Sequence, residues 1–202
     1  QPFISLDDIA VPLLEANINT DQLLPSRYLR KQRAEGFGQY LFRDLRYRDE
    51  VQESTGFILN QTPYRAAKII VASTNFGCGS SREMAVWAVA DYGIRVLISS
   101  RFADIFYNNC FKNGMLPIVL SADIVDTLFK QVAAAPNYKL QVDLAAQTVS
   151  TPSGETFSFS VDAFRKHCLL NGLDDIGLTM QHQDKIKAFE ARHQQAQPWL
   201  YN

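Results

Sequence analysis

The sequence predicts a single α/β domain, built on a mixed sheet with a parallel β-α-β-α-β core. Residues 68–120 alternate short apolar runs with helical stretches, which is typical of parallel strands joined by right-handed crossovers. Residues 139–161 instead alternate polar and apolar side chains around a turn at residues 153–154, which favours antiparallel pairing. No repeat, low-complexity tract or linker divides residues 1–202, so one domain is expected.

Composition and charge exclude several classes of protein. The formal net charge is −1, so no basic surface is expected to attract nucleic acid or an anionic membrane. No apolar run approaches the roughly 20 residues that a membrane span requires, and the first residues lack the features of a signal peptide. Cys78, Cys110 and Cys168 are odd in number and far apart, without a CxxC pair. This favours reduced thiols in a cytoplasmic protein with no metal site of its own.

The N-terminal part of the chain predicts little regular structure. A strand is expected at residues 8–14, where Pro12 indicates a sheet edge or a kink. Residues 17–25 hold Asn, Thr and Asp side chains that bond nearby backbone groups, which is typical of a loop. Residues 26–48 are basic and aromatic, and two glycines divide them into a loop and a short helix. That segment is either a solvated surface or a flexible flap over an anionic substrate.

The centre of the chain predicts a strand, a glycine-bearing loop and a helix. The β-branched, apolar run at residues 68–73 is typical of a strand covered on both faces. Residues 74–79 supply the Asn and Gly residues of a tight turn. Ser80 and Glu83 have the spacing of a capping box, with Ser80 as the N-cap. The helix that follows is apolar nearly all round, which predicts burial, and Gly93 is placed to end it.

Two further strand-and-helix steps complete the expected parallel core, and antiparallel strands and helices follow it. The expected strands are residues 94–99, 115–120, 139–144 and 156–161, and the expected helices are residues 102–113, 122–135, 162–171 and 174–195. Residues 174–202 form a polar helical extension that is expected to lie on the surface.

The central loop fails the tests for nucleotide-binding and hydrolase motifs. Residues 77–82 begin like a dinucleotide fingerprint, but Arg82 replaces the third glycine and the next strand ends without an acidic residue. No lysine stands in the register of a phosphate-binding P-loop, and the serine has the wrong offset for a hydrolase elbow. All the histidines fall late in helical stretches, which argues against a Ser-His-Asp triad: His167, His182 and His193.

The same loop favours a site for a carboxylate. Arg82 offers a planar fork for bidentate pairing, and Ser80 or Ser81 can donate to a bound group or take a proton from it. Backbone N–H groups at the helix start would stabilise a serine that has lost its proton. An alternative remains open, in which Ser80 and Glu83 only cap the helix and Arg82 is a solvated residue.

Three blocks of sequence carry a resemblance to a known family. They are residues 76–85 (FGCGSSREMA), residues 91–95 (DYGIR) and residues 102–117 (FADIFYNNCFKNGMLP). In this order they closely resemble the small subunit of 3-isopropylmalate dehydratase, which is related to the swivelling fourth domain of aconitase. Residues 19–25 (NTDQLLP) resemble another family segment, although Asn19 stands where an Asp is usual; Asp21 is kept.

The resemblance implies a β/β/α swivelling domain and half of a heteromeric hydro-lyase of leucine biosynthesis. Its reaction isomerises 2-isopropylmalate to 3-isopropylmalate by loss and re-addition of water. In such relatives a 4Fe-4S cluster, bound by cysteines of the large subunit, acts as the Lewis acid. The implied partners are therefore that large subunit and a small dicarboxylic acid, with no cofactor or metal in this chain.

The family motif also implies roles for individual residues. Ser80 would be the catalytic base, as an alkoxide held by backbone N–H groups, and Arg82 would pair with a substrate carboxylate. The remaining substrate-binding residues implied by the match are Ser81, Gly79, Thr20 and Asp21. Cys78 and Cys110 are expected to be packing residues. The basic residues 30–33 would contact substrate or belong to the loop that recognises the isopropyl group.

Two alternatives to this function stay open. In the first, the chain would be a subunit of a related dehydratase for citrate, homoaconitate or citraconate-type acids. These enzymes share the central motif, and the loop that lines the pocket decides which acid is bound. In the second, the chain would be a non-catalytic subunit that binds carboxylates or assists assembly, with Ser80 serving as a cap.

Overall fold

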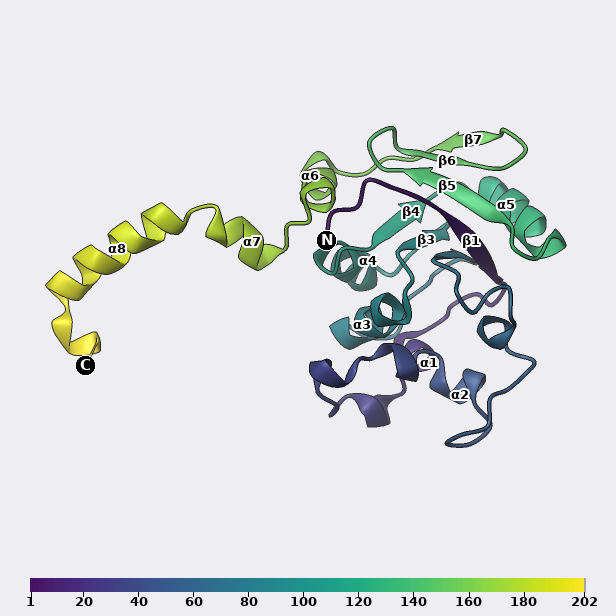
Figure 1. Cartoon of the computed structure of the whole chain (residues 1–202), viewed down its shortest axis with the longest axis horizontal. Helices are drawn as coiled ribbons and strands as arrows, with labels where there is room; N and C mark the ends of the chain where they lie inside the picture. The colour runs from purple at the N-terminus through teal and green to yellow at the C-terminus, as the bar shows by residue number, and fades with distance from the viewer. Residues whose placement is uncertain (202) are drawn as a thin grey trace.

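The computed structural model describes residues 1–201, and its centre is one seven-stranded mixed sheet in the order β4-β3-β2-β1-β5-β6-β7 (Figure 1). The strands β4 to β1 pair in parallel, and β1, β5, β6 and β7 pair antiparallel. The strands are β1 Ser5–Leu13, β2 Ile69–Ala72, β3 Val96–Ser99, β4 Leu116–Val119, β5 Lys139–Asp143, β6 Thr148–Ser150 and β7 Thr156–Ser158. The predicted parallel core and antiparallel region thus share one sheet.

Strand β1 joins the two halves of the sheet. The expectation that Pro12 marks a sheet edge holds only locally, because β1 has neighbours on both sides but each neighbour pairs with a different half of the strand. Its first half pairs with β5, from Ser5 to Ile9, and its second half pairs with β2, from Ala10 to Leu13. At Pro12 the strand therefore has a neighbour on one side only, and a residue without an N–H group is tolerated there.

The two faces of the sheet bury alternate residues of the same apolar strands. In β2, Ile70 and Ala72 join the core beneath helices α3 (Glu83–Tyr92) and α4 (Asp104–Lys112). Ile69 and Val71 join the opposite core, with helices α5 (Ala122–Ala134) and α6 (Ala163–Asn171). A strand covered on both faces needs apolar residues at every position, which explains the continuous apolar runs in the sequence.

The segment between β1 and β2 packs against the α3 side of the sheet through very short helices. They are α1 (Thr20–Leu23), η1 (Ser26–Tyr28), η2 (Arg33–Glu35), η3 (Gly38–Tyr40), α2 (Arg43–Arg46) and η4 (Ile58–Asn60). Phe37, Leu41 and Phe42 are at most 1% exposed, so the interpretation of residues 26–48 as a solvated surface is wrong for this part. Residues 30–35 are exposed, and a flexible substrate loop there stays a prediction.

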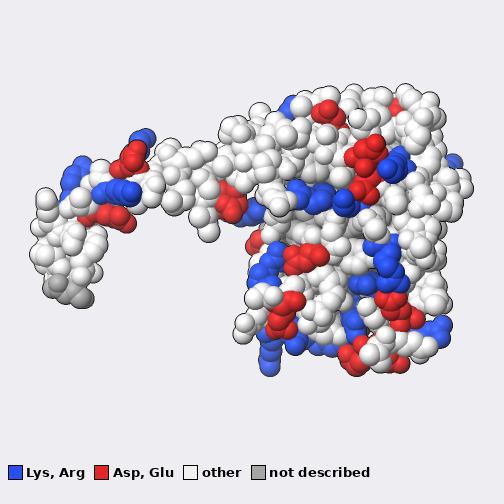
Figure 2. Space-filling view, viewed as in Figure 1, with Lys and Arg blue, Asp and Glu red and all other residues white. Residues whose placement is uncertain are grey.

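Charged side chains are interspersed on the face seen in Figure 2. Lys and Arg lie next to Asp and Glu, mostly over the lower half that holds α1 to α3, and no patch of one sign dominates this face. Within residues 1–201, no helix is long and apolar enough to cross a membrane.

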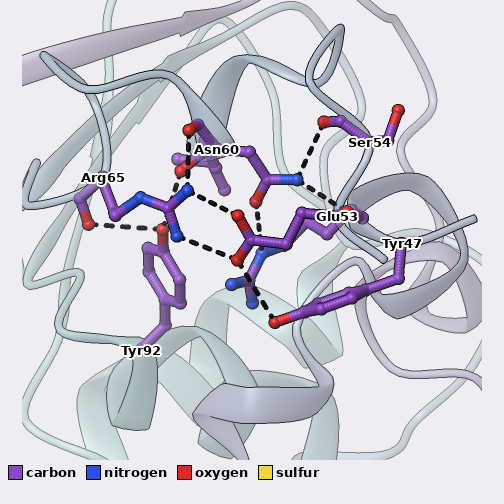
Figure 3. A network of polar contacts seen from close by, with 8 residues as sticks. Tyr47, Glu53, Ser54, Asn60, Arg65 and Tyr92 are labelled. Carbon is purple, nitrogen blue, oxygen red and sulfur yellow. Dashed lines mark hydrogen bonds and ion pairs between the residues drawn. The ribbon is translucent and has the colours of Figure 1, made fainter. Parts of the chain in front are cut away.

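A network of polar contacts holds residues 46–65 against Tyr92 of α3 (Figure 3). The buried Arg46 donates to the Asn60 side chain, and Asn60 donates to the backbone oxygens of Arg46 and Ser54 at 2.6 and 2.9 Å. Arg65 pairs with both carboxylate oxygens of Glu53 and also donates to the Asn60 backbone oxygen at 2.8 Å. Long stretches without regular structure need such side-chain partners for their backbone groups.

The chain ends in an arm that projects from the body. Helices α7 (Asp175–Met180) and α8 (Gln183–Ala196) extend away from α6, and the short helix η5 (Pro198–Leu200) follows (Figure 1). The expected single helix at residues 174–195 is therefore two helices, and neither contains a buried residue. Phe189 and Trp199, both more than half exposed, are among the apolar side chains that this arm leaves in solvent.

Candidate functional site

Two loops that lie far apart in the sequence meet at the carboxyl ends of β1 and β2. The backbone N–H of Gly77 donates to Ile18 O, and that of Thr20 donates to Cys78 O, both at 2.8 Å. A β-bridge pairs Asn19 with Cys78. The two motifs identified in the sequence, residues 19–25 and 76–85, are thus brought together by backbone hydrogen bonds. In open α/β sheets this edge is the usual place for a ligand site.

Two glycines let these loops approach each other and the core. Gly77 has φ +79°, and a Cβ atom there would lie 2.2 Å from Cγ of Phe106. Gly79 has φ +98°, and a Cβ atom there would lie 3.3 Å from Cβ of Asn19. Both positions therefore favour glycine for its backbone angle, and Gly77 also for lack of space.

Ser80 receives hydrogen bonds from several directions. Its Oγ lies 2.6 Å from Oγ1 of Thr20. It accepts from Nε of Arg82 at 2.9 Å and from the backbone N–H of Arg82 at 3.3 Å. The residue is half-buried, so its oxygen is held by these partners while the residue keeps contact with solvent.

The predicted capping box of α3 is wrong. The helix begins at Glu83, its N-cap position is Arg82, and the Arg82 side chain does not bond the free backbone groups of the first turn. Instead of reaching back to Ser80, the Glu83 carboxylate accepts from Nδ2 of Asn113 at 2.8 Å. The interpretation of Ser80 as only a cap therefore loses its geometric basis. Gly93 does end α3, with φ +113°.

Arg82 forms a bidentate ion pair with Asp21. Its Nη1 and Nη2 atoms lie 2.7 and 2.9 Å from the two carboxylate oxygens. The side chains are 27% and 58% exposed, so this pair lies at the rim of the site and not beneath it. One arginine thus contacts both the serine of one motif and the carboxylate of the other, while further guanidinium N–H groups stay available.

Asn19, the one visible departure from the family pattern, caps the short helix α1. Its side chain accepts from the backbone N–H of Gln22, and the Gln22 side chain accepts from the backbone N–H of Asn19. Asparagine and aspartate are about equally good at an N-cap, so the substitution preserves the local structure.

The other predicted substrate-binding residues differ in accessibility. Thr20 is only 1% exposed and its hydroxyl contacts Ser80, so Thr20 does not line an open cleft as expected. Ser81 is exposed, and no hydrogen bond involves its side chain within residues 1–201. Gly79 is exposed beside Asn19. The expectation of several backbone N–H groups around Ser80 is met by one, from Arg82.

The Thr20–Ser80 contact has no signal in the sequence. The two residues are separated by 60 positions, and each belongs to a loop after a different strand. Only the parallel pairing of β1 with β2, which places these strand ends side by side, brings the hydroxyls together.

The cysteines offer no clustered ligands. Cys110 is fully buried in the core of α3 and α4, and burial raises the pKa of its thiol well above the usual value, as expected of a packing residue. The thiol of Cys78 lies 3.3 Å from the backbone oxygen of Asn17. Within the part of the chain that the structure describes, no three His, Cys, Asp or Glu side chains gather as metal ligands.

Three family models match successive parts of the chain. Residues 1–123 match the family model of the aconitase C-terminal domain, and residues 126–163 match LeuD_N. Residues 175–202 match the model of the C-terminal domain of the 3-isopropylmalate dehydratase small subunit.

Full-length relatives extend this agreement. The 3-isopropylmalate dehydratase small subunit of Neisseria gonorrhoeae is 51% identical over 209 residues, covering 99% of this chain and 98% of that protein. A crystal structure of 3-isopropylmalate dehydratase from Methanocaldococcus jannaschii has a TM-score of 0.65 at 22% identity, covering 94% of this chain and 99% of the other. The structural likeness confirms the predicted fold, and the sequence identity shows the family. This chain therefore belongs to the family of 3-isopropylmalate dehydratase small subunits.

Proposed function

We propose that this chain supplies the catalytic base of a two-subunit 3-isopropylmalate dehydratase, with Ser80 as that base. Family membership supports the reaction. The observation that supports the role of Ser80 is the convergence of two Arg82 N–H groups on its half-buried oxygen, at 2.9 and 3.3 Å, with the Thr20 hydroxyl 2.6 Å away. Donors aimed at one oxygen favour its negatively charged form.

The chemistry of the reaction explains why such a base is needed. A proton next to a carboxylate is weakly acidic, and hydroxide is a poor leaving group. Dehydration therefore needs a strong base that removes the proton from one carbon, and an electrophile that binds the hydroxyl oxygen on the neighbouring carbon. When Ser80 removes the proton its alkoxide becomes a hydroxyl, and it returns a proton to carbon in the reverse direction.

The electrophile belongs to the partner in this proposal. The three cysteines of this chain do not fit a 4Fe-4S cluster, because Cys110 is fully buried and no three possible ligands gather anywhere in residues 1–201. We assign the cluster to the large subunit, where it supplies Lewis-acid chemistry to the substrate. The residues of this chain then hold the substrate and move its proton.

Arg82 binds a substrate carboxylate in this scheme. The guanidinium has N–H donors beyond those that contact Ser80 and Asp21, and it is partly exposed. A partly exposed ion pair contributes only about 0–1 kcal/mol, so a second carboxylate can share or displace Asp21 at small cost. Ser81 and Gly79, both exposed beside Arg82, would contact the same bound acid.

Residues 30–35 are proposed to recognise the remainder of the substrate. They are exposed, and they carry Arg30, Lys31 and Arg33. Arg33 is paired with Asp91, at the end of α3, at 3.0 Å, whereas Lys31 pairs with its own neighbour Glu35. A panel of acids, including citrate and citraconate, assayed on the reconstituted enzyme measures the preference for 2-isopropylmalate.

Reconstitution with the large subunit tests the proposal. Ser80→Ala is expected to lower kcat by about 10³-fold, because the base is lost, while gel filtration shows that the complex still forms. The matched control is Ser158→Ala, an exposed serine in β7 at the far edge of the sheet, which should retain full activity. Turnover by Ser80→Ala close to that of the control would refute the role of Ser80.

A separate experiment tests the assignment of the cluster to the large subunit. The isolated chain should be inactive and hold no iron, and activity should appear only when the large subunit, loaded with its cluster, is added. Stoichiometric iron on the isolated chain would contradict the assignment of the cluster to the partner.

A further inference from the structure

The Ser80 oxygen has more potential donors than a neutral hydroxyl can accept. The Nε–H and the backbone N–H of Arg82 both point to it, at 2.9 and 3.3 Å. Neither group can act as an acceptor, so together they occupy both lone pairs of a serine hydroxyl. The Thr20 hydroxyl, at 2.6 Å, is a third neighbour.

The Thr20 hydroxyl has one partner in the part of the chain that the structure describes. Thr20 is 1% exposed, and the Ser80 oxygen is the group that its Oγ1 contacts. A buried hydroxyl that donates to nothing loses the free energy of a hydrogen bond. The Thr20 hydroxyl is therefore expected to donate to the Ser80 oxygen.

Deprotonation of the Ser80 hydroxyl would let its oxygen accept a hydrogen bond from each of these donors. A neutral Ser80 must turn its own proton toward Thr20 or give up one of the Arg82 bonds. An alkoxide has a third lone pair and accepts from all of the donors at once, through charge-assisted bonds that are stronger than neutral ones. Hydrogen bonds made to the charged form lower the pKa of a group.

We infer that Thr20 is a positioning residue, whose hydroxyl donates to the Ser80 oxygen, holds it toward the substrate and favours its deprotonated form. This inference rests on the proposed function of Ser80. Thr20 acts through Ser80 and does not touch the substrate, since it is buried.

The fold fixes both members of this pair. Thr20 is the first residue of α1, and its backbone N–H donates to Cys78 O, two residues before Ser80. The branched side chain of threonine restricts its rotamers, so the hydroxyl keeps its direction. Ser80 follows a glycine whose neighbour is Asn19, the N-cap of α1. The base is therefore held by loops from two adjacent parallel strands.

Removal of the hydroxyl at constant shape tests the inference. In the reconstituted two-subunit enzyme, Thr20→Val is expected to lower kcat by about 10- to 100-fold. It should also raise the pKa of the base, so the acidic limb of the kcat–pH profile moves to higher pH by about one unit. Thr20→Ser, which keeps the donor, should restore the normal limb.

A matched control exists elsewhere in the chain. Thr151 is also buried, 6% exposed, and its Oγ1 lies 2.8 Å from Oγ of Ser153 in the turn between β6 and β7. Thr151→Val removes an equivalent hydroxyl contact outside the site, so its pH profile should match that of the unaltered enzyme.

The outcomes separate this inference from the proposed function. An unchanged kcat–pH profile in Thr20→Val, with Ser80→Ala inactive, would overturn the role of Thr20 and leave Ser80 as the base. If valine prevents assembly, Thr20→Ala replaces it in the comparison. Equal profiles for alanine, serine and threonine at this position would overturn the inference as well.

Discussion

Two arginine–carboxylate pairs in this protein have the same geometry and different surroundings. Arg82 contacts both oxygens of Asp21 at 2.7 and 2.9 Å, and Arg65 contacts both oxygens of Glu53 at 2.9 and 2.6 Å. Around Arg65, one further donor ends on a backbone oxygen, that of Asn60 (Figure 3). Around Arg82, a donor ends on the side-chain oxygen of Ser80.

The difference lies in what receives the hydrogen bonds. A backbone oxygen cannot change its charge, so donors that end on it stabilise one conformation of the loop. A serine oxygen can lose a proton, so donors that converge on it also favour a reactive state. The ion pair alone therefore does not separate the two arginines; the proposed role of Arg82 rests on its second partner, Ser80.

The largest expected effect is a loss of stability, and it concerns the polar network around Arg46 and Arg65. Arg46→Leu leaves the Asn60 side-chain oxygen and the backbone oxygens of Gly38 and Leu41 without their buried donor. The free energy of unfolding should fall by about 3 kcal/mol, measured by urea denaturation. Arg48→Leu is the control, because the Arg48 side chain is exposed and has no ion pair within residues 1–201. Equal stability of the two variants would contradict a structural role for the network.

A smaller effect is expected from Arg82→Lys, and it should appear in catalysis. Lysine is a point charge that cannot replace the fork, so the KM of the reconstituted enzyme should rise about tenfold. Because the Nε donor to Ser80 is also lost, kcat should fall. An unchanged KM would argue against contact between Arg82 and a substrate carboxylate.

The same substitution at the structural pair sharpens the contrast. Arg65→Lys should lower the urea midpoint slightly, well below the effect of Arg46→Leu, because the Arg65–Glu53 pair is partly exposed. KM and kcat should not change. A catalytic defect equal to that of Arg82→Lys would show that the two pairs are not functionally distinct.

The smallest expected effect is the pH dependence of the structural pair. The guanidinium of Arg65 holds the pKa of the Glu53 carboxyl below its ordinary value. A lowered folded-state pKa gives stability that is complete above the ordinary glutamate value, near 4.5, and is lost as the pH falls below it. Glu53→Gln should therefore flatten the acid dependence of unfolding. Glu190→Gln, on the exposed arm, should leave it unchanged.

The sequence predicted the parallel core because the strands and helices of that core are each marked by residues close together in the sequence. Continuous apolar runs mark strands buried on both faces, and Gly93 ends α3 where expected. Strand β6 was not predicted, since it has only three residues, Thr148–Ser150, and its pairing depends on β5 and β7. The division of the last helix at Gln181 and His182 was also missed, because neither residue is a glycine or proline.

The candidate site was predicted by residue type more than by geometry. The motif identified Ser80, Arg82 and Asp21, and the structure brings these residues into contact. The capping-box prediction failed because Glu83 has a tertiary partner, Asn113, that no local pattern reveals. The burial of Thr20 follows from the pairing of two distant loops, which sequence spacing does not contain.

The contact between Gly77 and Phe106 limits how this site can evolve. The aromatic ring fills the space that any larger residue at position 77 would occupy, so the loop and α4 can only change together. Residues 30–35 are exposed to solvent and are held to α3 by the Arg33–Asp91 ion pair, which does not fix the size of the neighbouring side chains. If the proposed roles hold, new acid preferences should arise among descendants of this protein by variation in that exposed segment, while the geometry around the Ser80 oxygen is inherited unaltered.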